Sequence, residues 1–288
     1  MKTKNDIHFS TCSWNYPEWV DVAVYSATRE RHYEYLPEYA EKFNAAEVDQ
    51  WFWSLMDNGS IRMPKTSDVK KYAELTPEDF RFTIKAPNSI TLTHFYKSEK
   101  TNKSFLSKDL LNDFVSILEP MKNKLGAIMF EFEYLNKTKM ASLADFIKAF
   151  GKFAESLPKD ITFAIETRNP NYLKKDFFNL LKEYNLGFVL IDGYYMPPAI
   201  KVYEEFNEYM KALPALIIRL LGKDRQGIEK ATAKTWNKIV EPRDETIAEI
   251  AKILLDFSKM KVPLYVNVNN HFEGSAPLTI QKINKLIQ

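Results

Sequence analysis

The 288-residue sequence is poor in several features that would assign a function class directly. Cys12 is its only cysteine, so no intrachain disulfide can form, which fits a reducing compartment. Only eight glycines occur, and neither a Walker phosphate loop nor the dinucleotide-binding glycine motif is present. The first ten residues hold no apolar stretch of signal-peptide length, and no window reaches the roughly 18 apolar residues of a membrane span. We therefore expect a cytoplasmic protein with no membrane partner and no organic cofactor.

Net charge also lacks a strong sign. The 40 Lys and Arg residues against 38 Asp and Glu residues give a formal charge of +2, so a broad basic face for duplex nucleic acid is not expected. A local basic mouth stays open, because the sum says nothing about distribution. Hydrophobic residues make up 45% of the chain, which is enough for a large core.

Short apolar runs alternate with amphipathic stretches along the whole chain, which is typical of βα units and a parallel sheet. The predicted strands are 7–12, 46–49, 81–85, 126–132, 162–166, 187–192, 215–220 and 264–268. The predicted helices are 32–43, 66–75, 107–122, 139–157, 173–184, 200–213, 243–260 and 276–287. Eight such pairs predict an α/β fold, a TIM-like (β/α)₈ barrel that forms a single domain over residues 1–288.

The stretches that break this rhythm all follow strands. They are 14–31, 51–65, 90–104, 192–199 and 222–242. In an α/β barrel such loops lie at the mouth formed by the carboxyl ends of the strands, where functional residues gather.

Polar side chains alternate with large apolar ones at the ends of the predicted strands. Glu166 alternates with Ile165, for example, and Arg219 with Ile218. Because large apolar side chains suit the helix-facing side, the polar set is expected in the lumen. Charged side chains are rarely buried unless they are paired, so we predict a partly wet, mutually paired pocket. Its members are Glu47, Asp49, Lys85, Glu131, Glu166, Arg168, Asp192 and Arg219. An ion-pair network that only closes the barrel is the alternative.

Roles are assigned within and around this pocket. Glu166, Asp192 and Lys85 are predicted as catalytic residues. The predicted substrate-binding residues are Arg168, Arg219, Trp14, Glu47, Asp49, Glu131, Asn269 and Asn270. Trp14, Trp51 and Trp53 either stack a planar ligand or anchor loops. Ser275 is placed to cap the last helix, where backbone N–H groups facing the mouth would suit a phosphate beside Arg219, although an ordinary N-cap gives the same pattern.

These residues resemble the family known as domain of unknown function 72, or YecE-like, over nearly the whole chain. The resemblance is carried by TCSW at 11–14, YPEW at 16–19, EVD at 47–49, FW at 52–53, TPEDFRF at 76–82, KAP at 85–87, IT at 90–91, FAIETRNP at 163–170, Arg219 with Gly222, and NN at 269–270 with Gly274, Ala276 and Pro277. It implies a TIM-like barrel and no settled activity. The chain departs from the family pattern at Ser13 and at the segment 131–133, and Asn169, Leu221 and Ser275 stand where the family has histidines. These replacements argue against a histidine-bound metal and leave a hard divalent ion on carboxylates as the metal to consider.

The sequence leaves three functions open, and whether the protein is an enzyme at all. The first is a hydrolase resembling a phosphoesterase, with a small phosphorylated or nucleotide-like substrate held by Lys85, Arg168 and Arg219. The second is a non-catalytic barrel that binds an anionic ligand or single-stranded nucleic acid. The third is a glycosidase-like hydrolase that uses Glu166 and Glu131 as its two carboxylates. Nothing in the sequence sets the oligomeric state.

Overall fold

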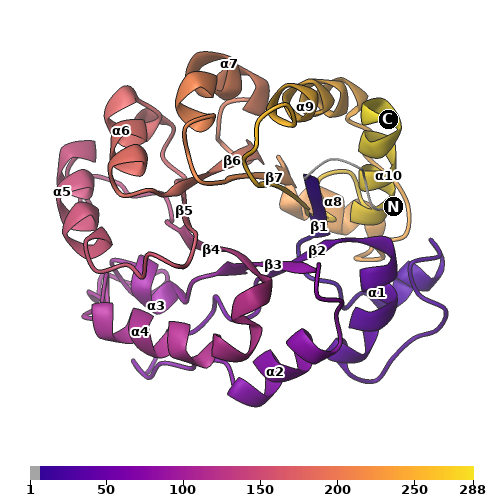
Figure 1. The fold of residues 1–288 in the computed structure, drawn as a ribbon, viewed down its shortest axis with the longest axis horizontal. Coiled ribbons are helices and arrows are strands. Elements are labelled where there is room, and N and C mark those ends of the chain that lie inside the picture. Colours follow the sequence, from indigo (N-terminus) through magenta and orange to yellow (C-terminus); the bar gives the residue numbers. More distant parts are fainter. Residues whose placement is uncertain (1–6) are drawn as a thin grey trace.

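Eight parallel strands form one sheet in the computed structural model, which describes residues 7–288 (Figure 1). The strands are β1 (Ile7–Thr11), β2 (Ala45–Val48), β3 (Arg81–Lys85), β4 (Leu125–Glu131), β5 (Phe163–Glu166), β6 (Gly187–Gly193), β7 (Leu216–Gly222) and β8 (Leu264–Val268). They pair in the order β1-β8-β7-β6-β5-β4-β3-β2, so the sheet curls into a nearly closed barrel. The predicted barrel is confirmed, and every predicted strand end lies within two residues of the observed one.

Helices surround the strands (Figure 1). They are α1 (Leu36–Lys42), α2 (Thr66–Glu74), α3 (Asn88–Thr91), α4 (Lys108–Ile117), α5 (Leu143–Ala154), α6 (Lys175–Glu183), α7 (Ala199–Met210), α8 (Arg225–Thr232), α9 (Asp244–Phe257) and α10 (Ala276–Ile287). Short 3₁₀ helices cover Pro17–Val20, His32–Tyr35, Glu119–Lys124 and Pro170–Tyr172. The sequence missed α3 and α8, which lie inside or beside predicted loops. None of the helices in residues 7–288 has the length and apolar character needed to cross a membrane.

The two edges of the sheet, β1 and β2, meet at a seam. Among the described residues no backbone ladder joins the two strands; Cys12, just beyond β1, forms an isolated parallel bridge with Glu47, and the Ser13 N–H donates to the Glu47 carbonyl at 3.1 Å. Side chains in the lumen add a second link, because Asn267 on β8 bonds both Ser10 on β1 and Glu47 on β2. The seam is therefore held partly by side chains that also belong to the mouth.

The lower part of the lumen is packed with small and medium apolar side chains. Ala127, Met129, Ala164 and Ile217 are buried there together with the Tyr265 ring. A Cβ at Gly126 would lie 2.7 Å from that ring, so glycine is required where β4 passes Tyr265. The helix-facing side chains of the same strands form a separate core with the helices. Polar residues are thus left to the upper end of the barrel.

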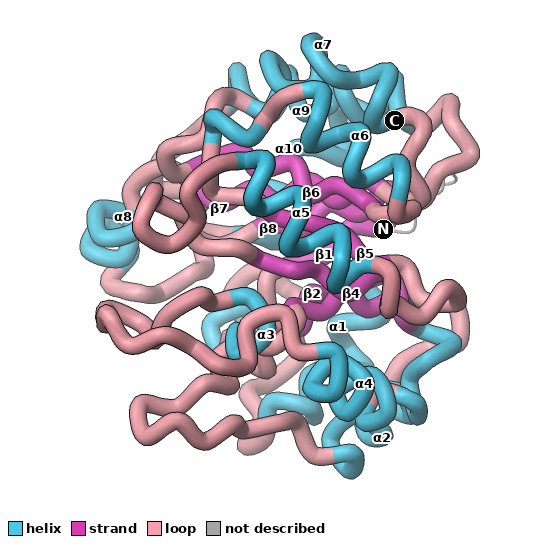
Figure 2. Tube along the Cα trace, turned by 90° about the vertical axis from the view of Figure 1, so that its left-hand side faces the viewer, coloured by secondary structure: helices cyan, strands magenta, loops and turns pink. Residues whose placement is uncertain are grey.

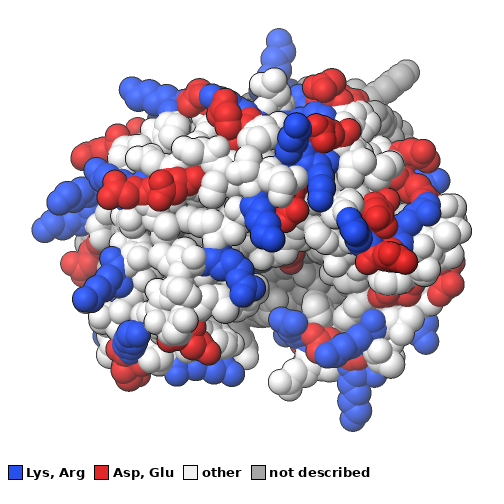
Figure 3. All heavy atoms as spheres, turned by 90° about the horizontal axis from the view of Figure 1, so that it is seen from below, with Lys and Arg blue, Asp and Glu red and all other residues white. Residues whose placement is uncertain are grey.

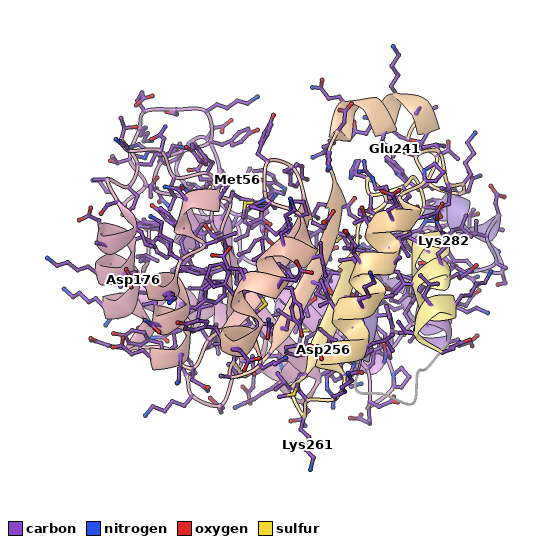
Figure 4. All side chains as sticks on the ribbon, turned by 90° about the horizontal axis from the view of Figure 1, so that it is seen from above. Met56, Asp176, Glu241, Asp256, Lys261 and Lys282 are labelled. Atoms are coloured by element: carbon purple, nitrogen blue, oxygen red, sulfur yellow. The ribbon has the colours of Figure 1, made fainter. Side chains whose placement is uncertain are left out.

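Long loops gather at that upper end. Figure 2 shows them together with α8 on one side of the molecule. In Figure 4, Met56 and Glu241, both from loops that follow strands, lie near one end of the barrel, and Lys261, from the turn before β8, lies at the other.

Candidate functional site

Arg219 on β7 is the centre of the charged group at the mouth. Its Nε and Nη2 donate to both oxygens of Glu47 at 2.8 and 2.7 Å, and its Nη1 donates to Glu166 Oε2 at 2.6 Å. The side chains of Arg219, Glu47 and Glu166 are at most 2% exposed. Its Nη1 also lies 3.3 Å from Glu131 Oε2. A buried guanidinium with its donors aimed at three carboxylates has little left to offer a substrate.

Lys85, Arg168 and Glu131 form the outer layer. Lys85 Nζ lies 3.0 Å from Glu131 Oε2, and Arg168 Nη2 lies 2.5 Å from Glu166 Oε1 and 3.3 Å from Glu131 Oε1. These three outer side chains reach the surface, with 12% to 18% of each exposed. We call Glu47, Lys85, Glu131, Glu166, Arg168 and Arg219 the mouth cluster. The structure thus brings together six of the eight charged residues predicted for the pocket.

Polar side chains that the predicted site omitted lie beneath this cluster. Asn267 Nδ2 donates to Glu47 Oε2 at 2.7 Å and to Thr83 Oγ1 at 2.9 Å, and Ser10 Oγ donates to Asn267 Oδ1 at 2.5 Å. All three are fully buried. Ser10, Thr83 and Asn267 alternate with Phe9, Phe82 and Val266 just as the charged residues alternate with their apolar neighbours, so the same pattern could have predicted them as lumen residues.

The ionisation of the cluster follows from its pairing. Burial opposes the charge on Glu47 and Glu131, but the neighbouring cations outweigh it and hold the pKa of both carboxyls below the usual value. Burial and Arg219 lower the pKa of Lys85, whereas Glu131 and Glu47 raise it and prevail. The cluster is therefore a set of mutually neutralised ions.

Asp49, just after β2, differs from the other carboxylates. No ion pair joins it to a described residue. Burial raises its pKa, Lys85 opposes the rise, and the charge of Glu47 adds to it. A carboxyl with a raised pKa and no ion-pair partner is a better proton acceptor than one locked in a salt bridge.

Asp192 does not join the mouth cluster, contrary to the sequence prediction. It pairs in register with Leu220, whose side chain faces the helices, and its Oδ2 accepts from the backbone N–H of Ala199 at 3.1 Å. Asp192 thus satisfies an N–H at the start of α7. Strand β6 is apolar on both faces, so no alternation marked which side Asp192 would take.

The predicted tryptophan platform is mostly internal. Trp14 is fully buried, and its Nε1 donates to the His32 carbonyl at 2.9 Å, so it anchors the first loop and cannot stack a ligand. Trp51 is also buried and stacks on Tyr72. Trp53 alone of the three is exposed.

The loop after β8 also differs from the prediction. Asn270 Oδ1 accepts from the Ala276 N–H at 2.8 Å, whereas the Ser275 side chain makes no cap bond and its buried hydroxyl has no partner among residues 7–288. Asn269 Oδ1 accepts from the His271 N–H. The start of α10 is buried and already capped, and Arg219 is engaged with Glu47 and Glu166, so the expected phosphate position is closed.

A hollow of about 850 Å³ opens beside the outer layer of the cluster. Glu131 and Arg168 of the outer layer line it, together with Tyr134, Tyr194, Tyr195 and Met196 and with Glu133, Pro170 and Asn171. The Arg168 guanidinium lies 4.7 Å from the centre of the Tyr194 ring. We call this the tyrosine hollow. Its aromatic residues follow β4 and β6 and were not predicted as site residues, although Tyr194 and Tyr195 stand in a predicted mouth loop.

The donor set does not fit a metal ion. Among residues 7–288 no three His, Cys, Asp or Glu side chains are grouped so as to hold one. The carboxylates of the cluster are instead shared among Lys85, Arg168 and Arg219.

Two departures from the family pattern have visible consequences. Ser13 adopts φ 66°, a left-handed conformation that favours glycine. Asn169 is buried and bonds both the N–H and the carbonyl of Leu135 at 2.8 and 2.9 Å, joining the loops after β4 and β5. Asn169, at a position where the family resemblance implied a histidine, therefore has a structural role.

Comparison with known proteins gives a consistent result. The family described as "Protein of unknown function DUF72" matches residues 8–288. The UPF0759 protein YecE of Escherichia coli is 25% identical over 169 residues, which is 59% of this chain and 51% of YecE, so the match spans about half of that relative. Crystal structures of DUF72 proteins from Thermotoga maritima (17% identity, TM-score 0.68, 98% of each chain) and Enterococcus faecalis (18%, 0.67, 98% of this chain and 95% of that one) share the fold.

Proposed function

The chain belongs to the DUF72 family, whose function is unknown, and we propose from the geometry of its site that it is a phosphoesterase acting on a nucleotide-like substrate. The observation that carries the proposal is the arrangement on the outer layer. Around the barrel, Asp49 follows β2, Lys85 ends β3, and Arg168 follows β5 and lines the tyrosine hollow, so the two partly exposed cations come between Asp49 and the hollow in strand order.

Each part has a chemical task. A phosphate over Lys85 and Arg168 would accept hydrogen bonds from these two partly exposed cations, in competition with Glu131, which is paired with both. A planar ring would lie against the tyrosines of the hollow. Water attacks phosphorus, Asp49 accepts its proton, the ester P–O bond breaks, and the leaving oxygen takes a proton from solvent.

The buried members of the cluster act as positioning residues. Glu166 holds the Arg168 guanidinium, and Arg219 holds Glu166 from below. This arrangement speaks against Glu166 and Glu131 as a glycosidase pair. Both are held by the same two arginines, and the lowered pKa of Glu131 leaves it no proton to donate.

The test is hydrolysis of a chromogenic nucleotide ester, thymidine 5′-(p-nitrophenyl phosphate), and of bis(p-nitrophenyl) phosphate. Asp49→Asn should lower kcat/KM by about 100-fold or more, as expected for loss of a general base. Asp113→Asn, an exposed change on α4, is the matched control and should not alter the rate. In the wild type the rate should rise with pH through a value above the ordinary Asp range. Equal rates for Asp49→Asn and wild type would refute the proposal.

A further inference from the structure

Two short hairpins stand side by side at the mouth, after β2 and β3. The first, residues 51–65, is closed by an antiparallel bridge between Leu55 and Ile61, and the second, residues 90–104, by one between His94 and Thr101. A Cβ at Gly59 in the first would lie 3.7 Å from the Phe95 ring in the second. We call them the twin hairpins.

Buried amides fix the frame of both hairpins. Asn88 Oδ1 accepts from the N–H groups of Ser54 and Leu55 at 3.0 and 2.9 Å. Asn102 Nδ2 donates to the carbonyls of Ser89 and Leu92 at 2.8 and 2.7 Å. The side chains on the outside of the hairpins are therefore presented from a fixed backbone.

A continuous row of aromatic rings runs from the mouth cluster onto this surface. Lys85 Nζ lies 5.2 Å from the centre of the Phe52 ring. Phe52 meets Trp53 with ring centres 5.1 Å apart, and Trp53 meets Tyr96 at 5.7 Å. Trp53 is 60% and Tyr96 59% exposed, an unusual exposure for large rings that touch each other.

Positive charge accompanies the rings. The twin hairpins hold five Lys and Arg residues against two acidic ones. Lys97 lies 5.3 Å from the Tyr96 ring centre, Lys100 lies 4.2 Å from that of Phe95, and Arg62 is exposed on the first hairpin. Figure 3 shows Lys and Arg side chains, with Asp and Glu side chains among them, around a hollow in the lower part of the view.

We propose that the twin hairpins are a docking surface for single-stranded nucleic acid, with unpaired bases on Trp53 and Tyr96 and phosphates along Lys97, Lys100 and Arg62. Exposed rings that alternate with cations are the surface that single strands recognise, because every base has a stacking face and every linkage a charge. A duplex hides its base faces and suits this surface less. The inference rests on the proposed function, since it makes an oligonucleotide the substrate that reaches Lys85.

The experiment measures fluorescence anisotropy of labelled DNA and RNA single strands of about 12 nucleotides, within the usual site size of such surfaces. For the wild type we expect binding with a log–log salt slope of about 2, the value for three phosphate contacts on a single strand. Trp53→Ala should weaken binding by about fivefold or more, and Trp53→Phe should largely restore it. Trp53 is exposed, so both variants should fold, which thermal unfolding verifies.

The charge control uses the opposite end of the barrel. Lys97→Glu should weaken binding and lower the salt slope, whereas Lys261→Glu makes the same charge change far from the hairpins and should do neither (Figure 4). The proposal is overturned by absence of binding at low salt, by equal binding of Trp53→Ala and wild type, by equal losses in the two lysine variants, or by equal affinity for a duplex. The anisotropy assay measures binding and does not depend on hydrolysis. Binding with no ester hydrolysis would therefore sink the proposed reaction alone, and hydrolysis with no binding would sink the docking surface alone.

Discussion

The buried guanidinium of Arg219 is the sharpest place to perturb this molecule. Arg219→Met keeps the length and apolar stem of the side chain, leaves Glu166 with Arg168, and leaves Glu47 without its main partner. Glu47 keeps only Lys85, at 4.0 Å, and the amide of Asn267. The desolvation cost of a buried carboxylate is no longer offset once its cation is removed.

The expected loss of unfolding free energy is about 3–5 kcal/mol, the usual range for breaking a buried ion pair from one side. Arg225→Met is the matched control, because Arg225 is exposed on α8, its partner Glu229 is partly exposed, and pairs at the surface contribute at most about 1 kcal/mol. Adding Glu47→Gln to Arg219→Met should recover about 1–3 kcal/mol, since it removes the orphaned charge.

The pH dependence of the unfolding free energy is a second measurement, and its sign should differ between the wild type and Arg219→Met. In the wild type the lowered pKa of Glu47 and Glu131 makes these carboxyls stabilising above the unfolded value, and that stability is lost as the medium becomes acidic. In Arg219→Met, burial outweighs what remains and raises the pKa of Glu47, so stability should grow as pH falls from 7 towards about 4, the value of an unfolded Glu. Urea unfolding at several pH values measures both. A loss no larger than that of Arg225→Met, or an unchanged pH slope, would refute the reasoning.

Three further predictions concern stability and use the same assay. Ser13→Gly relieves a left-handed backbone, and we expect a gain of about 1 kcal/mol; a loss would mean that the Ser13 side chain outweighs the strain. Asn270→Ala should lower the unfolding free energy by about 1–2 kcal/mol, because the Ala276 N–H loses its cap. Ser275→Ala removes an unpartnered buried hydroxyl and should be neutral or stabilising. A larger loss in Ser275→Ala than in Asn270→Ala would show that Ser275 is the capping residue. Asn169→Ala should cost about 2–4 kcal/mol, because two buried backbone groups lose their partner, and a loss below about 1 kcal/mol would contradict this.

The sequence predicted most of the mouth cluster for a definite physical reason. A parallel strand with helices on one face and a lumen on the other alternates strictly, so Glu131, Glu166 and Arg219 were placed by their apolar neighbours. The barrel itself followed from eight repeats of the same pattern. Asp192 failed because its strand is apolar on both faces and carries no such alternation.

The rest depended on contacts between residues distant in the chain. Nothing local to Trp14 shows that the carbonyl of His32 will receive its N–H and bury it. Asn270 caps a helix that begins six residues later, which a search for the adjacent capping residue does not find. Helix α8 has few buried side chains, so its pattern read as loop, and the tyrosine hollow combines loops from β4 and β6 that no single segment reveals.

The seam between β1 and β2 has a consequence for how such sequences change over evolutionary time. Glu47 both neutralises Arg219 and, through its backbone and Asn267, ties the two edges of the sheet together. A lineage that abandoned its reaction would still be selected to retain Glu47, Asn267 and Arg219, because replacing any one of them loosens the barrel. This trio is therefore a signature of barrel closure in a related sequence, and under the proposed function it would signal chemistry only where Asp49 and Lys85 accompany it.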